Sequence, residues 1–139
     1  MVVDDLSTAR VLVVDDSDLW RGYLLTKLYD ARVVVVGIAS NGEDAVQQAL
    51  ALQPDLVLMD VRLPGMSGLE AARRIWQGSP ESEILFVSNE ADPGVVRAAF
   101  TAGGRGYVLK ALAAMELIDG MKAVLRGEPF LSSGLKGLE

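Results

Sequence analysis

The sequence predicts an α/β fold in which a parallel β-sheet has helices on both of its faces. Two observations predict this fold class. Five short runs rich in Val, Leu and Ile alternate with five longer segments of helical periodicity, and the runs show little polar alternation. Strands that helices bury on both faces have such apolar runs. Because regular alternation of strand and helix gives parallel strands with right-handed crossovers, we expect a (βα)5 doubly wound parallel sheet.

The expected elements follow one another along the chain with short connections. The expected strands are the apolar runs at residues 10–14, 32–38, 55–59, 83–87 and 106–109. The expected helices are the periodic segments at residues 17–29, 42–52, 68–77, 93–102 and 113–126. A helix that packs on a sheet carries one apolar stripe. The stripe of the first helix is Trp20, Tyr23, Leu24 and Leu28, and that of the last helix is Ala114, Ile118, Met121 and Leu125.

Capping residues mark where several of these helices begin and end. Asn41 comes just before Glu43 and Asp44, which gives an N-cap followed by an acidic first turn. Ser67 and Glu70 have the spacing of a capping box. Glycines follow the fourth and fifth expected helices, as is usual at helix ends: Gly103, Gly104 and Gly127.

Length and composition limit what the chain can be. Its 139 residues suit one domain, which we expect over residues 1–131, with a short tail over residues 132–139. The sequence has no Cys and no His, which excludes disulfides, thiolate chemistry, Ser-His triads and His-ligated zinc. The net charge of −6 argues against unaided binding to nucleic acid or anionic membranes. No apolar run reaches the roughly 18 to 20 residues of a membrane span, and the acidic start does not resemble a secretory signal, so the expected location is cytoplasmic.

Polar residues directly follow four of the five expected strands. Asp15 and Asp16 follow the first strand, Asp60 the third, Ser88 the fourth and Lys110 the fifth. Because ligands bind at the carboxyl ends of the strands in such sheets, we expect these side chains to meet in one crevice. Each residue alone has a common structural role, as a helix cap, a turn former or a solvated charge. Their joint occurrence at one end of the sheet favours a functional site.

The chemistry expected of this crevice is phosphoryl transfer to a carboxylate. Two carboxylates about 4 Å apart repel by about 4 kcal/mol at an effective dielectric constant near 20, and a divalent cation relieves that repulsion. Oxygen ligands without His or Cys favour a hard ion, so Mg²⁺ is the expected cofactor. Since Mg²⁺ uses one or two carboxylates, one carboxylate remains free to act as a nucleophile. Lys110 can neutralise charge on the transferred group, and Ser88 can donate a hydrogen bond to it.

Three segments together resemble the receiver domains of bacterial two-component systems. They are Val11-Leu12-Val13-Val14-Asp15-Asp16, Leu58-Met59-Asp60-Val61-Arg62-Leu63-Pro64-Gly65 and Gly106-Tyr107-Val108-Leu109-Lys110. Further segments are similar to the LuxR-type subgroup of response regulators: Ala102-Gly103, Arg105-Gly106-Tyr107 and Leu125-Arg126-Gly127-Glu128. The resemblance covers about residues 8–131. It implies a flavodoxin-like sheet with strand order 2-1-3-4-5.

The resemblance also implies specific roles for the residues of the crevice. A sensor histidine kinase would phosphorylate Asp60. The Mg²⁺ ligands would be Asp16, Asp60 and the backbone carbonyl of Arg62, with Asp15 acting mostly through water. Lys110 would pair with the phosphorylated carboxylate. Such a domain is not an enzyme in the ordinary sense, because it catalyses only its own Mg²⁺-dependent phosphorylation and dephosphorylation.

Other residues would sense, tune or transmit phosphorylation. Ser88 and Tyr107 match the family's two switch residues. The Ser88 hydroxyl would move toward the phosphate and the Tyr107 ring would turn inward, although an aromatic residue in a strand is often only a core residue. Arg62 and Glu90 each lie two residues past a reacting group, so we expect them to tune the lifetime of the phosphoryl group. Residues 93–126 are the expected output face, which would bind a second copy of the chain or a downstream protein.

The chain departs from the family pattern at three positions. Ala111 follows Lys110 where receivers often have a proline in a cis bond, so the sequence leaves the isomer open. Ser17 stands where LuxR-type receivers usually have His, and Gly104 stands where they usually have Ala. None of these differences removes a reacting group.

Several alternatives remain open from the sequence. A stand-alone receiver is favoured over the N-terminal receiver fragment of a LuxR-type transcriptional regulator. The intact reacting residues argue against an inert pseudo-receiver that only binds proteins. A phosphatase with an Asp nucleophile needs a second Asp two residues later, where this chain has Arg62. A flavodoxin needs a Ser-, Thr- and Gly-rich loop after the first strand, where this chain has Asp15-Asp16-Ser17-Asp18.

Overall fold

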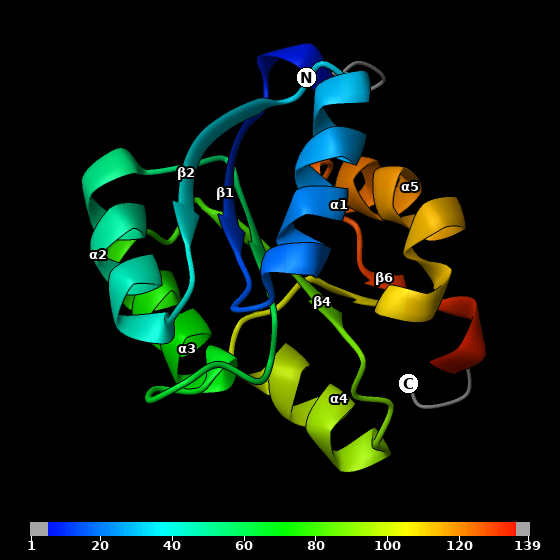
Figure 1. Cartoon of the computed structure of the whole chain (residues 1–139). Helices are drawn as coiled ribbons and strands as arrows, with labels where there is room; N and C mark the ends of the chain where they lie inside the picture. The colour runs from blue at the N-terminus through cyan, green and yellow to red at the C-terminus, as the bar shows by residue number, and fades with distance from the viewer. Residues whose placement is uncertain (1–5, 136–139) are drawn as a thin grey trace.

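The computed structural model describes residues 6–135 and has one parallel sheet with helices on both faces (Figure 1). The strands are β1 (Arg10–Val14), β2 (Val34–Ala39), β3 (Leu56–Met59), β4 (Glu83–Ser88), β5 (Gly106–Leu109) and β6 (Phe130–Leu131). The helices are α1 (Asp18–Asp30), α2 (Gly42–Leu52), α3 (Gly68–Gly78), α4 (Pro93–Thr101) and α5 (Ala113–Leu125). Short 3₁₀ turns are η1 (Leu6–Thr8), η2 (Lys110–Leu112) and η3 (Ser133–Leu135).

The topology confirms the predicted fold class. The strands lie in the order β2-β1-β3-β4-β5-β6, and each neighbouring pair is parallel. The predicted (βα)5 sheet with order 2-1-3-4-5 is therefore present, and β6 extends it at the β5 edge. Within residues 6–135, no helix has the length and apolar character needed to cross a membrane.

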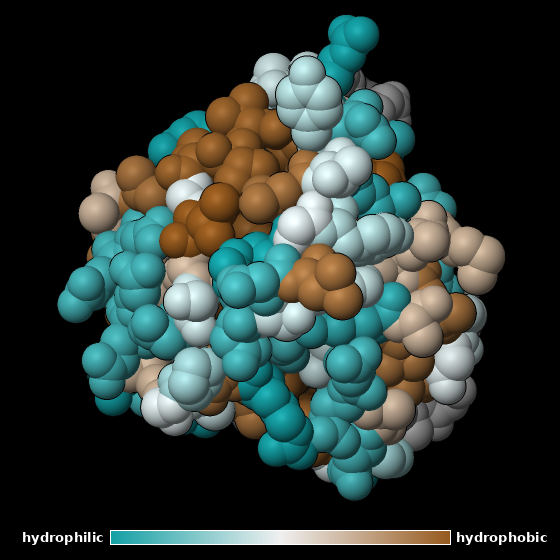
Figure 2. All heavy atoms as spheres, viewed as in Figure 1, coloured by the Kyte–Doolittle hydropathy of each residue, from teal (hydrophilic) through white to brown (hydrophobic). Residues whose placement is uncertain are grey.

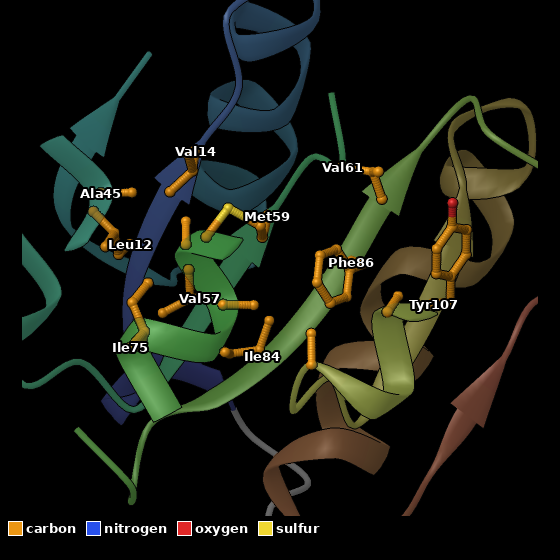
Figure 3. Packing of buried hydrophobic residues seen from close by; sticks show 14 of the residues in the cluster. Leu12, Val14, Ala45, Val57, Met59, Val61, Ile75, Ile84, Phe86 and Tyr107 are labelled. Atoms are coloured by element: carbon orange, nitrogen blue, oxygen red, sulfur yellow. The ribbon is translucent and has the colours of Figure 1, made fainter. Parts of the chain in front are cut away.

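The sheet separates two apolar cores. Alternate residues of β1 point to opposite faces, so Leu12 and Val14 belong to one core while Val11 and Val13 belong to the other. Helices α2, α3 and α4 cover the first core, and Figure 3 shows how its side chains pack on the sheet. Helices α1 and α5 cover the second core. The carboxyl ends of the strands are left uncovered between these two helical layers, where loops carry the polar residues.

Strand β2 differs from the prediction that helices bury every strand on both faces. It lies at the edge of the sheet, where Val34 is 46% exposed and Ile38 is 43% exposed. Figure 2 shows apolar side chains gathered on the surface over β2 and the neighbouring end of α2. The strand also begins later than predicted, because Arg32 has a φ of 62° and belongs to the turn after α1.

The predicted apolar stripes of α1 and α5 are each right in part. In α1, Leu24 and Leu28 are buried as predicted and Trp20 is half-buried, whereas Tyr23 is 39% exposed. In α5, Met121 is buried and Ile118 and Leu125 are partly buried against the core, whereas Ala114 is exposed. The fully buried residues of α5 are Ala113, Leu117, Gly120, Met121, Ala123 and Val124. The helix is apolar around most of its circumference, so periodicity alone did not fix which side faces the sheet.

The predicted caps are present. The side chain of Asn41 accepts a hydrogen bond from Asp44 N at 2.8 Å, and that of Ser67 accepts one from Glu70 N at 3.2 Å. The Glu70 carboxylate binds the guanidinium groups of Arg73 and Arg74 on the next turn of α3. Gly103 and Gly127 follow α4 and α5 with φ of 111° and 80°, a left-handed conformation that favours glycine. These signals place α2, α3, α4 and α5 close to their predicted bounds.

The packed domain extends further toward the C-terminus than predicted, because part of the expected tail is buried. Strand β6 pairs with β5, Ser132 is fully buried, and Leu135 is only 4% exposed. Residues 136–139, the end of the expected tail, and residues 1–5 lie outside the described residues. All described peptide bonds are trans, including the one between Lys110 and Ala111 that the sequence left open.

Candidate functional site

Four strands deliver polar side chains to one crevice at the carboxyl end of the sheet. Asp15 follows β1, Asp60 follows β3, Ser88 ends β4, and Lys110 follows β5. These four strands are neighbours in the sheet and run parallel, so the ends of all four meet at the same edge. The predicted convergence is therefore present.

Three carboxylates form the acidic part of the site. One oxygen from each of Asp15, Asp16 and Asp60 lies within 4.8 Å of the other two. Asp15 is 1% exposed and Asp60 is 7% exposed, whereas Asp16 is exposed to solvent. The Asp15 carboxylate accepts a hydrogen bond from Ser17 N at 2.8 Å, which fixes the first turn after β1. Burial raises the pKa of the Asp15 carboxyl, and the hydrogen bonds from Lys110 and Ser17 offset only part of this effect.

Lys110 joins the two buried carboxylates. Its Nζ lies 2.8 Å from Asp15 Oδ2 and 2.9 Å from Asp60 Oδ2, and its side chain is 9% exposed. Burial alone lowers the pKa of Lys110, but the hydrogen bonds to Asp15 and Asp60 outweigh burial and raise it. The ammonium group therefore stays charged at neutral pH. It also lies 5.2 Å from the centre of the Trp20 ring, within the range of a cation–π interaction.

A close backbone approach positions Asp60. Helix α3 begins at Gly68, and a Cβ atom at this position would lie 1.8 Å from the carbonyl oxygen of Asp60. Gly68 N donates a hydrogen bond to Val61 O at 2.8 Å. Only glycine allows α3 to start this close to the Asp60 loop. We did not predict this role, and the only signal for it in the sequence is a glycine directly after the capping residue Ser67.

Ser88 and Tyr107 are both linked to the backbone of Glu90. The Ser88 Oγ accepts a hydrogen bond from Glu90 N at 3.1 Å, and Tyr107 Oη donates one to Glu90 O at 2.6 Å. Tyr107 is fully buried and stacks on Phe86 with ring centres 6.1 Å apart (Figure 3). Burial raises the pKa of the Tyr107 phenol to about 12. The ring thus already lies inward in this structure, as part of the core.

Arg62 and Glu90 face each other across the entrance to the site. Arg62 Nε and Nη2 lie 2.9 Å and 2.6 Å from Glu90 Oε2, so the two side chains form an ion pair. The Arg62 side chain is 74% exposed and that of Glu90 is 23% exposed. A cavity of about 190 Å³ lies beside this pair, and its lining is Asp60, Arg62, Ser88, Asn89 and Glu90. Asn89 is a lining residue that the sequence did not single out.

A second, more apolar hollow of about 600 Å³ adjoins Lys110 on its other side. Its lining comes from the start of α1, the loop after β4 and the turn after β5: Ser17, Leu19, Trp20, Tyr23, Asn89, Lys110 and Ala111. Leu19 is 89% exposed, and Trp20 and Tyr23 contact each other with ring centres 4.9 Å apart. The Trp20 Nε1 atom is buried and has no hydrogen-bond partner within residues 6–135.

Comparison with known proteins agrees with this geometry. The response regulator receiver domain family matches residues 11–122. The response regulator GacA of Pseudomonas viridiflava is 39% identical over 125 residues, which cover 88% of this chain and 58% of that protein. The transcriptional regulatory protein LiaR of Bacillus subtilis strain 168 is 35% identical over 129 residues, covering 92% of this chain and 61% of that protein. The chain therefore spans about three fifths of the length of these relatives.

Solved structures show the same likeness. A two-component response regulator of the LuxR family from Aurantimonas sp. SI85-9A1 superposes with a TM-score of 0.86 at 33% identity, covering 92% of each chain. The response regulator domain of Thermotoga maritima CheB superposes with a TM-score of 0.76 at 28% identity, covering 87% of this chain and 98% of that domain.

The chain belongs to the response regulator receiver domains of bacterial two-component systems. Receiver domains are signalling modules and not enzymes in the ordinary sense, and they act in phosphorylation-dependent signalling. Members of the family typically bind Mg²⁺ at an acidic pocket, and response regulators are phosphorylated by sensor histidine kinases. The relatives GacA and LiaR are response regulators of the LuxR type, as the sequence predicted.

Proposed function

We propose that this receiver domain accepts a phosphoryl group on Asp60 from a sensor histidine kinase and thereby changes how it binds a partner. The observation that carries the proposal is the position of Asp60. Its carboxylate contacts Lys110 at 2.9 Å, lies near two further carboxylates, and lines the cavity that holds Ser88. The nucleophile thus contacts a cation and shares a cavity with a hydroxyl donor.

Asp60 is a better acceptor than either neighbouring carboxylate. The two oxygens of Asp15 are held by Ser17 N and by Lys110 Nζ, and the residue is only 1% exposed. Asp16 is exposed and does not line the cavity beside Ser88. In the proposed step, an Asp60 oxygen attacks the phosphorus of a phosphohistidine. The P–N bond breaks, and its electron pair returns to the imidazole nitrogen. Hydrolysis later breaks the bond between phosphorus and the Asp60 oxygen.

The residues of the site fit Mg²⁺. The three carboxylates and the carbonyl of Arg62 offer only oxygen ligands, the donors that this ion prefers. Asp16, Asp60 and the Arg62 carbonyl would hold the ion, and Asp15 would bind it mostly through water. Its contribution when bound would be to neutralise charge on the phosphoryl oxygens. Asp16 can change its contacts easily because it is exposed, whereas Asp15 is already tied to Lys110.

Ser88 and Lys110 would bind the phosphoryl group. The Ser88 Oγ accepts from Glu90 N and also interacts with the Tyr107 hydroxyl, and its hydrogen would turn toward a phosphoryl oxygen once one is present. Lys110 would shift its ammonium group from Asp60 toward the added phosphoryl oxygens. Because Glu90 is linked to Ser88 and also to Tyr107, movement of Ser88 would change the position of Tyr107 and of the loop before α4. Ser88 and Tyr107 would thus act as the switch.

Arg62 and Glu90 would tune the lifetime of the phosphoryl group. Their ion pair lies at the wall of the cavity that a hydrolytic water must enter to reach Asp60. The pair is partly exposed, so its contribution to stability is only about 0–1 kcal/mol. An effect on hydrolysis would therefore come from blocking or orienting water and not from a change in fold.

The output of the switch would be a change in protein binding at residues 93–126. This face contains α4, β5 and α5, which adjoin Ser88 and Tyr107. Val96 is buried, while Val95 and Phe100 are half-buried, so most of the apolar surface of α4 packs in the core. A second copy or a downstream protein would bind this face, since the net charge of −6 disfavours direct contact with nucleic acid. In a longer LuxR-type regulator, an output domain would respond instead.

Phosphorylation by a small-molecule donor tests the proposal. The protein is incubated with acetyl phosphate and Mg²⁺, and its intact mass is followed over time. We expect one phosphoryl adduct in the wild type and none in Asp60→Asn. Asp30→Asn, which alters an exposed carboxylate at the far end of α1, is the matched control and should be phosphorylated normally. An adduct that persists in Asp60→Asn would contradict the proposal.

A further inference from the structure

The last described residues lie along the outer edge of β5. We call residues 130–135 the strap. Phe130 pairs with Gly106 and Leu131 pairs with Tyr107, in the parallel direction. Figure 1 shows this segment beyond α5, with β6 next to the turn at which α5 begins. The strap therefore occupies the backbone edge that β5 would otherwise present to another strand.

A network of hydrogen bonds fastens the strap to β5 and to α5. Ser132 N donates to Tyr107 O at 2.9 Å, and Leu109 N donates to Ser132 Oγ at 2.9 Å. The same hydroxyl donates to Glu116 Oε1 at 2.5 Å, and Ser133 N donates to Glu116 Oε2 at 3.1 Å. We call the Glu116 carboxylate with its two serines the latch. Ser132 is fully buried, so breaking the latch would leave buried polar groups without partners.

Apolar contacts place the strap on the predicted output face. Leu135 is 4% exposed and belongs to the same core cluster as Tyr107 and Val96. Leu131 packs against this cluster as well. Part of the surface formed by α4, β5 and α5 is thus already covered by a segment of the chain itself.

We propose that the strap is released from the latch when Asp60 is phosphorylated and is held by the latch when Asp60 is unmodified. This inference rests on the function proposed for Asp60. The structural basis of the inference is β5, because neighbouring residues at its end bind the site on one side and the strap on the other. Tyr107 binds Glu90 through its hydroxyl and Ser132 through its carbonyl. Leu109 binds Ser132, and the next residue, Lys110, binds Asp60.

Phosphorylation of Asp60 would change the contacts of Lys110 and of Ser88, which link the site to β5. A phosphoryl group adds a charge of about −1.5 to −2 and draws Lys110 and Ser88 toward its oxygens. Lys110 would then pull on the end of β5, and Ser88 would give up its present contact with Glu90 N. Ser132 of the strap is hydrogen-bonded to Tyr107 O and Leu109 N of β5. A shift of β5 would therefore lengthen and weaken these hydrogen bonds. Reciprocally, a weaker latch must favour the phosphorylated state.

Hydrogen exchange on the whole chain tests this inference, with beryllofluoride and Mg²⁺ as the probe. The variants are Glu116→Gln, which weakens the acceptors of the latch, and Ser132→Ala, which removes its hydroxyl. Asp119→Asn, an exposed carboxylate one turn further along α5, is the matched control. Without the probe, both latch variants should exchange the amides of Leu109 and Ser133 several-fold faster than the wild type and the control.

Two further results are expected when the probe is added. Exchange of the strap amides in the wild type should rise toward the level of Glu116→Gln, and Glu116→Gln should bind beryllofluoride several-fold more tightly than the wild type. Binding of the probe with unchanged strap exchange would overturn the inference and leave the function of Asp60 intact, and so would equal or weaker affinity in Glu116→Gln. Failure of the wild type to bind the probe would overturn both the proposed function and the inference.

Discussion

The ammonium group of Lys110 lies 2.9 Å from the carboxylate of Asp60. The same ammonium group lies 2.8 Å from Asp15, so one cation contacts both buried carboxylates. Lys110 is therefore needed for the stability of the resting site as well as for phosphoryl binding, and these two roles can be separated by experiment.

Replacing Lys110 with Met should lower the free energy of unfolding by about 3 kcal/mol without Mg²⁺, because buried carboxylates lose their cation. Urea unfolding measures this loss. Mg²⁺ should restore more stability in Lys110→Met than in the wild type, since the ion then supplies the positive charge that the ammonium group no longer provides to Asp15 and Asp60. Lys122→Met, in the last turn of α5, is the control and should change stability by less than about 0.5 kcal/mol. Equal stability of the two variants would contradict the role of Lys110.

Substitution of Arg62 or Glu90 with Ala should change the rate at which phosphorylated protein loses its phosphoryl group. The reason is that either change opens the wall of the cavity beside Asp60. The rate is measured by intact mass after removal of the phosphoryl donor. Stability should change by no more than about 1 kcal/mol, because the ion pair is partly exposed. Arg74→Ala, which breaks an exposed ion pair on α3, should leave the rate unchanged. Identical decay in all of these proteins would rule out tuning by this pair.

The phenol of Tyr107 should make the folded protein sensitive to alkaline pH. Burial raises its pKa to about 12, whereas an unfolded tyrosine loses its proton near pH 10. Between these values the folded state binds more protons than the unfolded state, so the free energy of unfolding falls as pH rises. The loss through this group is on the order of 2 kcal/mol. Tyr107→Phe lacks the phenol and should lose correspondingly less stability from roughly pH 10 to roughly pH 12. Parallel losses in both proteins would contradict the assignment.

Replacement of Gly68 with Ala should damage both the fold and the site. The added methyl group would collide with the Asp60 carbonyl oxygen, so α3 must move away from the Asp60 loop. We expect a loss of stability of about 1–3 kcal/mol and slower phosphorylation by acetyl phosphate. Gly22→Ala is the matched control, because a methyl group at this position of α1 meets no atom within 4 Å. That change should stabilise the protein by roughly 0.5–1 kcal/mol. Wild-type phosphorylation rates in Gly68→Ala would argue against this positioning role.

Much of the site could be predicted because its residues directly follow apolar strands. Asp15, Asp60, Ser88 and Lys110 lie where a parallel sheet brings strand ends together, and the structure places them there. The role of Gly68 could not be predicted in this way. A close approach between a helix and a distant backbone depends on the packing of α3 and leaves no periodic pattern in the sequence.

The other differences between the predicted and the observed fold concern β6, α5 and β2. Strand β6 contains only two residues and follows Pro129, so it lacks the length of an apolar run. Helix α5 is apolar on several sides, so apolar periodicity alone does not identify its buried side. Val34 and Ile38 are exposed because β2 is an edge strand, and strand order was not evident from apolar periodicity alone.

The identity of the phosphorylated residue is the most direct test of the account. The protein is phosphorylated with acetyl phosphate and Mg²⁺, then treated with borohydride, which reduces an aspartyl phosphate to homoserine, and the digested peptides are sequenced by mass spectrometry. The account predicts homoserine at position 60 and unmodified aspartate at Asp15 and Asp16. Homoserine at position 15 or 16, or its absence from a protein that carries a phosphoryl adduct, would contradict it.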